Sequence, residues 1–169
     1  MRILGIDPGL NLTGYAVLEA GARGPGVVEA GVIRGADGRS KADMAERLRI
    51  LYEGIVEVVE QFHPNAMAVE QLYAHYDHPR TAILMAHARG VLLLAGGQRG
   101  LGVFSYAATQ IKKTITGSGR AAKDQVQRVI QRELGLAAPP EPPDVADALA
   151  AALCHYYRQK KPTDLRKRA

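Results

Sequence analysis

Four acidic residues in this chain stand where apolar segments begin or end. Asp7 closes the run "RILGI", Glu70 closes "NAMAV", and Asp144 and Asp147 lie three residues apart at the start of "PPDVADALAAAL". Each has an ordinary explanation alone, because Asp-Pro-Gly is a turn sequence and acids in the first turn of a helix satisfy free backbone N–H groups. Gathered at one sheet edge, however, they would raise their own pKa values unless a cation compensated them.

Such a cluster would select a particular kind of cation and a particular chemistry. Oxygen ligands without cysteine favour the hard cations Mg²⁺ and Mn²⁺. Two such ions, about 4 Å apart, activate water and stabilise the leaving oxygen when a phosphodiester is cleaved. The four carboxylates therefore predict a two-metal nuclease site, provided that the fold brings them together.

The spacing of apolar residues predicts the elements that must position these acids. Strands are expected over residues 2–7, 13–20, 26–34, 65–72 and 102–106, the first three as an antiparallel meander. Helices are expected over about 20 residues from Ser40 onward and over residues 79–96, 108–115, 121–134 and 143–158. In the first helix Ser40-x-x-Asp43 resembles a capping box. This order predicts an α/β fold with a five-stranded mixed sheet and helices on both faces.

The last expected helix carries its two acids on one face, followed by small residues. Ala148 and Ala151 share that face, and the larger apolar residues lie on the other side: Val145, Leu149, Leu153 and Tyr156. Small side chains let a helix approach its neighbour closely. We therefore expect Asp144 and Asp147 to face the sheet.

Composition fits one domain, and the basic charge leaves two interpretations open, since the tail could grip nucleic acid or could simply be a solvated end. The 169 residues are 47% apolar, and we expect a single domain over residues 1–157 followed by a basic tail over 158–169, which holds six Lys or Arg and one acid. Residues 99–132 hold seven basic residues and one acid. The chain has no apolar stretch of membrane-spanning length and no export signal at its N-terminus, so we expect a cytoplasmic protein. A single cysteine, Cys154, excludes an intrachain disulfide and a cysteine-based zinc site.

Five separated blocks of the sequence resemble the RuvC family of Holliday-junction resolvases. They are "GIDPGLNLTGYAV", "AVEQLY", "HARGVLLLA", "YAATQIKKTITGSGRAAKDQVQ" and "DVADALAAALCH", and the resemblance covers about residues 1–157. It implies a ribonuclease H-like fold and a homodimer that uses Mg²⁺ to cut two opposed strands of a four-way DNA junction in recombination and repair. It also implies the branch-migration proteins RuvA and RuvB as partners. By motif, the family's catalytic, metal-binding carboxylates fall on Asp7, Glu70, Asp144 and Asp147.

The same resemblance, together with the position of Arg120, indicates candidate DNA contacts. The family's DNA-contacting lysines fall on Lys112 and Lys123, and its aromatic residue after the catalytic glutamate falls on Tyr73, where a base could stack. Arg120 follows "TGSG", whose backbone N–H groups could meet a phosphate beside these lysines. The family places its dimer contact on the apolar helix that contains residues 83–95.

Other functions are compatible with parts of the sequence. "GIDPGLNLTG" resembles the first phosphate loop of the actin and sugar-kinase domains, but the chain is about half the expected size and lacks a second such hairpin. A ribonuclease H-like nuclease that acts on RNA is a closer alternative. A binding module without activity is a third, and the complete set of acids argues against it. His75 and His78 are three residues apart, but a metal site needs further ligands.

Overall fold

The computed structural model describes residues 1–35, 43–72 and 79–160. The strands, in chain order, are β1 (Arg2–Asp7), β2 (Leu12–Gly21), β3 (Gly24–Arg34), β4 (Ala66–Glu70) and β5 (Gly102–Tyr106). The helices are α1 (Met44–Phe62), α2 (Pro79–Gln98), α3 (Ala108–Thr116), α4 (Lys123–Glu133) and α5 (Pro143–Gln159). Apart from the start of α1, each boundary lies within two residues of the expected one.

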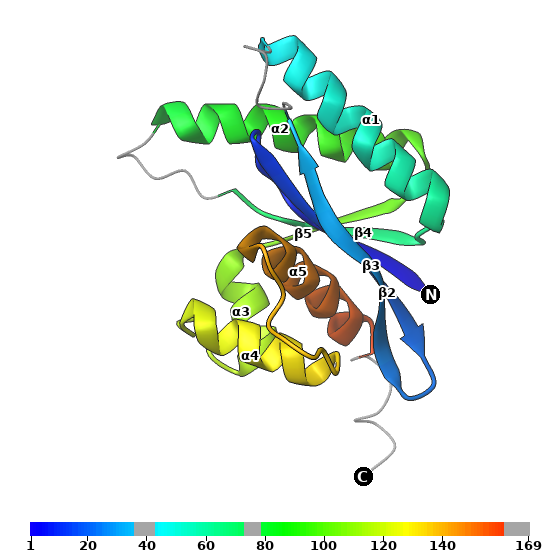
Figure 1. Ribbon diagram of the computed structural model, residues 1–169, viewed down its shortest axis with the longest axis vertical. Helices are drawn as coiled ribbons and strands as arrows, with labels where there is room; N and C mark the ends of the chain where they lie inside the picture. Colours follow the sequence, from blue (N-terminus) through cyan, green and yellow to red (C-terminus); the bar gives the residue numbers. More distant parts are fainter. Residues whose placement is uncertain (36–42, 73–78, 161–169) are drawn as a thin grey trace.

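The strands form one mixed sheet in the order β3-β2-β1-β4-β5. The first three strands are antiparallel neighbours, while β4 runs parallel to β1 and β5 runs parallel to β4. Helices α1 and α2 lie on one side of the sheet and α3, α4 and α5 on the other (Figure 1). The predicted fold class is confirmed.

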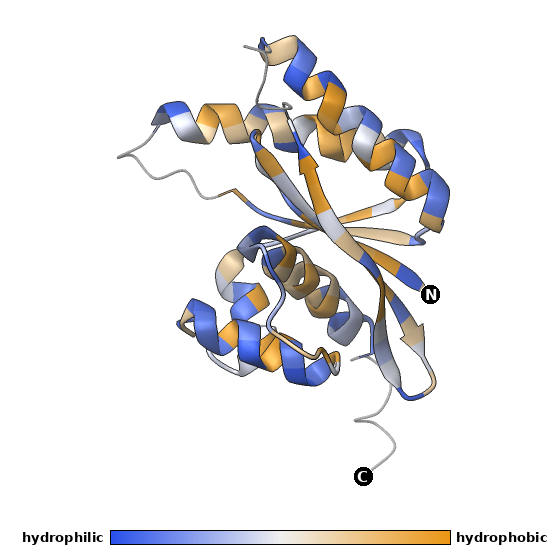
Figure 2. Ribbon diagram, viewed as in Figure 1, coloured by the Kyte–Doolittle hydropathy of each residue, from blue (hydrophilic) through white to orange (hydrophobic). Residues whose placement is uncertain are grey.

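Two hydrophobic layers hold the sheet between the helices, because successive strand residues point to opposite faces. On β1, Leu4 and Ile6 pack with residues of α1 and α2, whereas Ile3 packs with residues of α5. Many strand residues are hydrophobic, while α4 is mostly hydrophilic with a few hydrophobic positions (Figure 2). None of the helices that the structure describes is both long and apolar enough to cross a bilayer.

Helix α1 begins later than the sequence pattern predicts. Its N-cap is Asp43, whose carboxylate accepts a hydrogen bond of 2.9 Å from the backbone N–H of Glu46. The expected box led by Ser40 is therefore wrong. The capping acid is Asp43 itself, followed three residues later by a glutamate, the usual spacing of such a box. Ser40 lies outside the described residues.

Helix α5 lies very close to the strands, as its small residues predict. A Cβ atom added to Gly5 would lie 2.0 Å from the backbone oxygen of Ala148 and 2.8 Å from the Cβ atom of Ala152. Both alanines and Ala151 are fully buried. Only a glycine on β1 allows this approach, so the position of α5 over the sheet is set by Gly5 and by the alanines that face it.

Candidate active site

Asp7 and Glu70 leave the sheet side by side. Ile6 of β1 and Val69 of β4 are partners in the parallel register, and each acid is the next residue and the last of its strand. Because parallel strands end at the same edge of a sheet, the two carboxylates lie on neighbouring strand ends. Both line a cavity of about 570 Å³ that is also bordered by Met85 of α2.

The turn after Asp7 is held by its own polar contacts. Thr13, which is fully buried, donates a hydrogen bond of 2.7 Å from Oγ1 to the carbonyl of Gly9. The N–H of Gly9 in turn donates a hydrogen bond of 3.3 Å to the Oγ1 atom of Thr13. These two contacts close the loop that follows Asp7 and lead the chain into β2.

The first turn of α5 lies beside the same strand end. Gly14 is the register partner of Asp7, and a Cβ atom at Gly14 would lie 2.1 Å from the backbone oxygen of Asp144. The N-cap of α5 is Pro142, and among the described residues no side-chain hydrogen bond caps this helix. Asp144 is therefore placed next to Asp7 and does not act as a cap.

Asp147 meets Glu70 across a second, smaller cavity. The two acids line a space of about 220 Å³ together with Lys112 of α3 and Lys123 of α4. The Nζ atom of Lys123 lies 3.0 Å from Oδ2 of Asp147. Glu70 borders both cavities, so Asp7, Glu70 and Asp147 follow one continuous surface, while Asp144 lies beside the strand end of Asp7 and lines neither cavity.

The carboxylates are short of positive charge. Burial, followed by the charges of Glu70, Asp147 and Asp144, raises the pKa of Asp7 from 3.8 to about 8, although Lys123 opposes this. Burial and the charge of Asp147 also raise the pKa of Glu70, against Lys112 and Lys123. Burial lowers the pKa of Lys123, but its hydrogen bond to Asp147 together with the charges of Asp147, Asp7 and Asp144 outweighs this effect and raises the pKa overall.

These residues suit a hard cation by their chemistry. All four donors are carboxylates, and the raised pKa of Asp7 shows that the site would gain from added positive charge. Within the described residues, no three His, Cys, Asp or Glu side chains already surround a single point that could hold a metal ion. Asp7, Glu70 and Asp147 border the two adjoining cavities with Asp144 close to Asp7, and the four acids do not form a closed cage.

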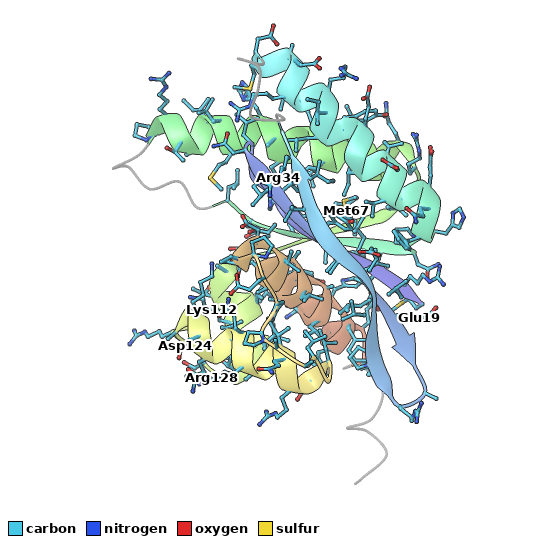
Figure 3. All side chains as sticks on the ribbon, in the orientation of Figure 1. Glu19, Arg34, Met67, Lys112, Asp124 and Arg128 are labelled. Carbon is cyan, nitrogen blue, oxygen red and sulfur yellow. The ribbon has the colours of Figure 1, made fainter. Side chains whose placement is uncertain are left out.

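The candidate DNA contacts separate into three groups. Lys112 and Lys123 lie at the acidic cavity, as described above. Arg120 lies in the exposed turn between α3 and α4, where its N–H donates to Oγ of Ser118 over 3.3 Å, and it lines neither cavity. Tyr73, with His75 and His78, lies outside the described residues. Figure 3 shows Lys112 on the same side of the molecule as Asp124 and Arg128 of α4.

The sequence patterns assign no function to one residue that lies at this strand edge. Arg89 of α2 donates from Nε to the backbone carbonyl of Glu70 over 3.2 Å, and from Nη2 to Oγ of Ser105 over 2.6 Å. The available signal was a single arginine inside the apolar segment "TAILMAHARGVLLLA". Such a residue needs polar partners, but the sequence does not show which strands supply them.

Comparison with known proteins identifies relatives along almost the whole chain. The family described as crossover junction endodeoxyribonuclease RuvC matches residues 3–155. A crossover junction endodeoxyribonuclease RuvC from Rhodopirellula baltica is 49% identical over 164 residues, which cover 96% of this chain and 89% of that protein. The corresponding protein of Hydrogenovibrio crunogenus is 44% identical over 154 residues, covering 91% of this chain and 86% of that protein.

Solved structures that superpose on this chain include Holliday junction resolvases. Thermus thermophilus RuvC in complex with Holliday junction substrate superposes with a TM-score of 0.86 and 31% identity, covering 95% of each chain. The yeast mitochondrial Holliday junction resolvase Ydc2 shares the fold, with a TM-score of 0.67 at 12% identity. The match covers 94% of this chain and 80% of the Ydc2 chain. The matches of family, sequence and fold agree over the residues that carry the four acids, and the chain belongs to the RuvC family of crossover junction endodeoxyribonucleases.

Proposed function

We propose that Asp7, Glu70, Asp144 and Asp147 form the site at which this RuvC-family endonuclease hydrolyses the strands of a four-way DNA junction. One observation carries the assignment: two strand ends and the first two turns of α5 bring all four acids to one edge of the sheet. Family membership decides against the RNA-directed nuclease and the nucleotide-binding domain as alternatives.

The RuvC family is metal-dependent, and we propose that this site holds two Mg²⁺ ions, which Mn²⁺ can replace. When bound between such carboxylates, the ions supply an activated water and stabilise the leaving oxygen. The residues of the chain have their own tasks. Asp7 and Glu70 would act as ligands from the strand ends and Asp144 and Asp147 from α5, while Lys123 holds the carboxylate of Asp147 in place.

Substrate binding is assigned to basic residues around the acids and to one aromatic residue. Lys112, Lys123 and Arg120 would contact phosphates, since residues 99–132 carry seven basic residues and one acid. Tyr73 follows Glu70 by three residues, and the family pattern supports stacking of its ring on a base at the junction centre. The basic residues 158–169 would add non-specific affinity as a tail beyond a nuclease domain of residues 1–157.

Two opposed cuts in one junction call for two active sites, so the proposal includes a homodimer. Helix α2 supports this, because Ile83 is 58% and Leu94 54% exposed on a helix that also buries Leu92 against the sheet. A second copy of α2 would cover these side chains. The proposal also places the enzyme in the cytoplasm, where RuvA and RuvB would deliver the junction.

Cleavage of a synthetic four-way junction in Mg²⁺, beside a linear duplex and an RNA hairpin, tests the assignment. Asp7→Asn, Glu70→Gln and Asp147→Asn should each abolish junction cleavage, with junction binding intact or tighter because phosphates meet less negative charge. Glu53→Gln on α1, on the other side of the sheet, is the matched control and should cut normally. A site variant that cleaves at the normal rate would remove its residue from the metal site.

A further inference from the structure

Arg89 connects helix α2 to the two strand ends beside the acidic site. Its guanidinium donates to the carbonyl of Glu70, the last residue of β4, and to the hydroxyl of Ser105 on β5. Ala88, the preceding residue, is fully buried and anchors α2 on the sheet. The arginine therefore starts from a fixed backbone and reaches two different strands.

In the part of the chain that the structure describes, Glu70 has a strand partner on one side only, Tyr106 of β5. Beyond Glu70 the strand pairing ends with one backbone hydrogen bond, in which the N–H of Gln71 donates to the carbonyl of Tyr106 over 2.9 Å. On the other side, the described pairing of β4 with β1 ends at Val69 and Ile6. A strand end with so few ladder bonds frays readily unless a side chain holds it.

Arginine suits this task better than lysine would. Its planar guanidinium carries several N–H donors in fixed directions, so one side chain can hold two acceptors on two strands at once. Lys112 and Lys123 act on the carboxylate of Glu70 through their charges, whereas Arg89 bonds its backbone. The two kinds of contact are separate, since one acts on the charge of Glu70 and the other on its position.

We propose that Arg89 is a positioning residue, which holds the carboxyl end of β4 against α2 and β5 so that the Glu70 carboxylate stays directed at its metal site. The inference rests on the proposed role of Glu70. It concerns the backbone of β4 and needs no contact between Arg89 and DNA or metal. Residues that orient metal ligands typically change metal affinity or activity by about 10- to 100-fold when they are replaced.

Amide hydrogen exchange of the metal-free protein gives the most direct measurement. In Arg89→Met the N–H of Gln71 should exchange faster, while the N–H groups of Met67 and Ala68, inside β4, should keep their protection. Arg49→Met removes an arginine of α1 that also bonds two acceptors and should leave Gln71 unchanged. Unchanged exchange at Gln71 in Arg89→Met would overturn the proposal.

Metal binding and cleavage provide the second measurement. Arg89→Met should bind Mn²⁺ more weakly in calorimetry without DNA, need more Mg²⁺ for half-maximal cleavage, and cut about 10-fold more slowly in single turnovers. Its junction Kd should stay within about twofold of the wild-type value, because both acceptors of Arg89 belong to the protein. A slower rate with wild-type metal dependence would mean a purely structural role and would overturn the proposal.

Two further variants keep the test decisive if Arg89→Met does not fold. Ser105→Ala removes one acceptor, and Arg89→Lys keeps the charge without the fork, so both should shift metal dependence in the same direction by a smaller amount. Wild-type behaviour of both would overturn the proposal. Glu70→Gln separates the two assignments: if it cuts normally, the proposed site is wrong, whereas the exchange of Gln71 still decides whether Arg89 holds the strand end.

Discussion

The ammonium group of Lys123 lies 3.0 Å from a carboxylate oxygen of Asp147, so a lysine expected to contact DNA is paired with an expected metal ligand. The pair joins α4 to α5 across the smaller cavity. The lysine side chain is 58% exposed and that of the acid 31%, so the ammonium also remains open to an approaching phosphate. One lysine can therefore serve the acids before DNA arrives and the substrate afterwards.

Lys123→Ala and Lys112→Ala should each weaken junction binding, because each removes one phosphate contact. Each should also reduce the slope of the logarithm of the junction binding constant against the logarithm of salt concentration by about one unit. Stability should change by less than about 1 kcal/mol, because exposed ion pairs contribute little. Binding titrations at several salt concentrations measure the slope. Arg49→Ala on α1 should leave it unchanged, and an unchanged slope in both lysine variants would mean that neither meets DNA.

Asp144→Asn should abolish cleavage while the melting temperature hardly changes. No side-chain hydrogen bond caps α5 in the described part of the chain, so the acid stabilises the helix only through its dipole, by about 0.3–1 kcal/mol, and its replacement also relieves repulsion of Asp7. Calorimetry and a junction-cleavage assay on the same preparation test this. A large loss of stability with residual cleavage would identify Asp144 as a structural residue.

The fold could be predicted from the sequence largely because its signals are local. Strand β4 is a short apolar run and α1 shows a clear helical period, so both were found with boundaries close to those observed, apart from the helix start. That start was misplaced because several polar residues precede the first apolar position of α1. The choice of Asp43 over Ser40 depends on a single hydrogen bond, which spacing does not specify.

The sequence could identify the residues of the candidate site, but not the contacts between them. The family pattern identified the acids, and the structure brings Asp7, Glu70, Asp144 and Asp147 to one edge. The contact of Lys123 with Asp147 could not be predicted, since it depends on how α4 packs against α5. The contact of Arg89 with Glu70 spans 19 residues and requires the packing of α2 on the sheet.

Without metal, the protein should lose stability as the pH rises from about 4 to 8. The pKa of Asp7 is raised from 3.8 to about 8, so the folded state holds a proton that the unfolded state has already released in this range. Stability from this group is complete below the unfolded pKa and is lost as the pH passes through the folded one. Glu70 acts in the same direction.

Calorimetry in EDTA between pH 5 and 8.5 measures this loss. Asp7→Asn should reduce the fall in melting temperature with rising pH, because the amide cannot ionise. In the wild-type protein, Mg²⁺ should also reduce this fall by compensating the negative charge of the carboxylates. Parallel curves for the wild type and Asp7→Asn would show that Asp7 ionises in the folded protein as easily as in the unfolded one.

Gly14→Ala should impair both stability and cleavage. The added methyl group would lie 2.1 Å from the backbone oxygen of Asp144, so the first turn of α5 must move away from Asp7. We expect a loss of about 1–3 kcal/mol, typical of overpacking, and a larger relative loss of cleavage. Gly26→Ala is the matched control, since a Cβ atom there meets no atom within 4 Å. Normal cleavage by Gly14→Ala would contradict the proposed position of Asp144.

Tyr73→Ala should bind junctions with a modest loss and cleave them much more slowly, since base stacking on an aromatic ring contributes about 1–3 kcal/mol. Tyr73→Phe should remain close to the wild type, because stacking uses the ring and not the hydroxyl. A fluorescent base analogue at the junction centre reports unstacking independently, and its signal should fall in the alanine variant. Wild-type cleavage by Tyr73→Ala would exclude the stacking role.

The position of α5 in chain order has a consequence for biosynthesis. Asp7 and Glu70 belong to elements made early, whereas Asp144 and Asp147 lie on the last element that the structure describes. A nascent chain on the ribosome therefore carries half of the proposed acids until this helix emerges and settles onto Gly5 and Gly14. On the proposed assignment the nuclease becomes active only when α5 packs onto the sheet, so the packing step that completes the core also completes the enzyme.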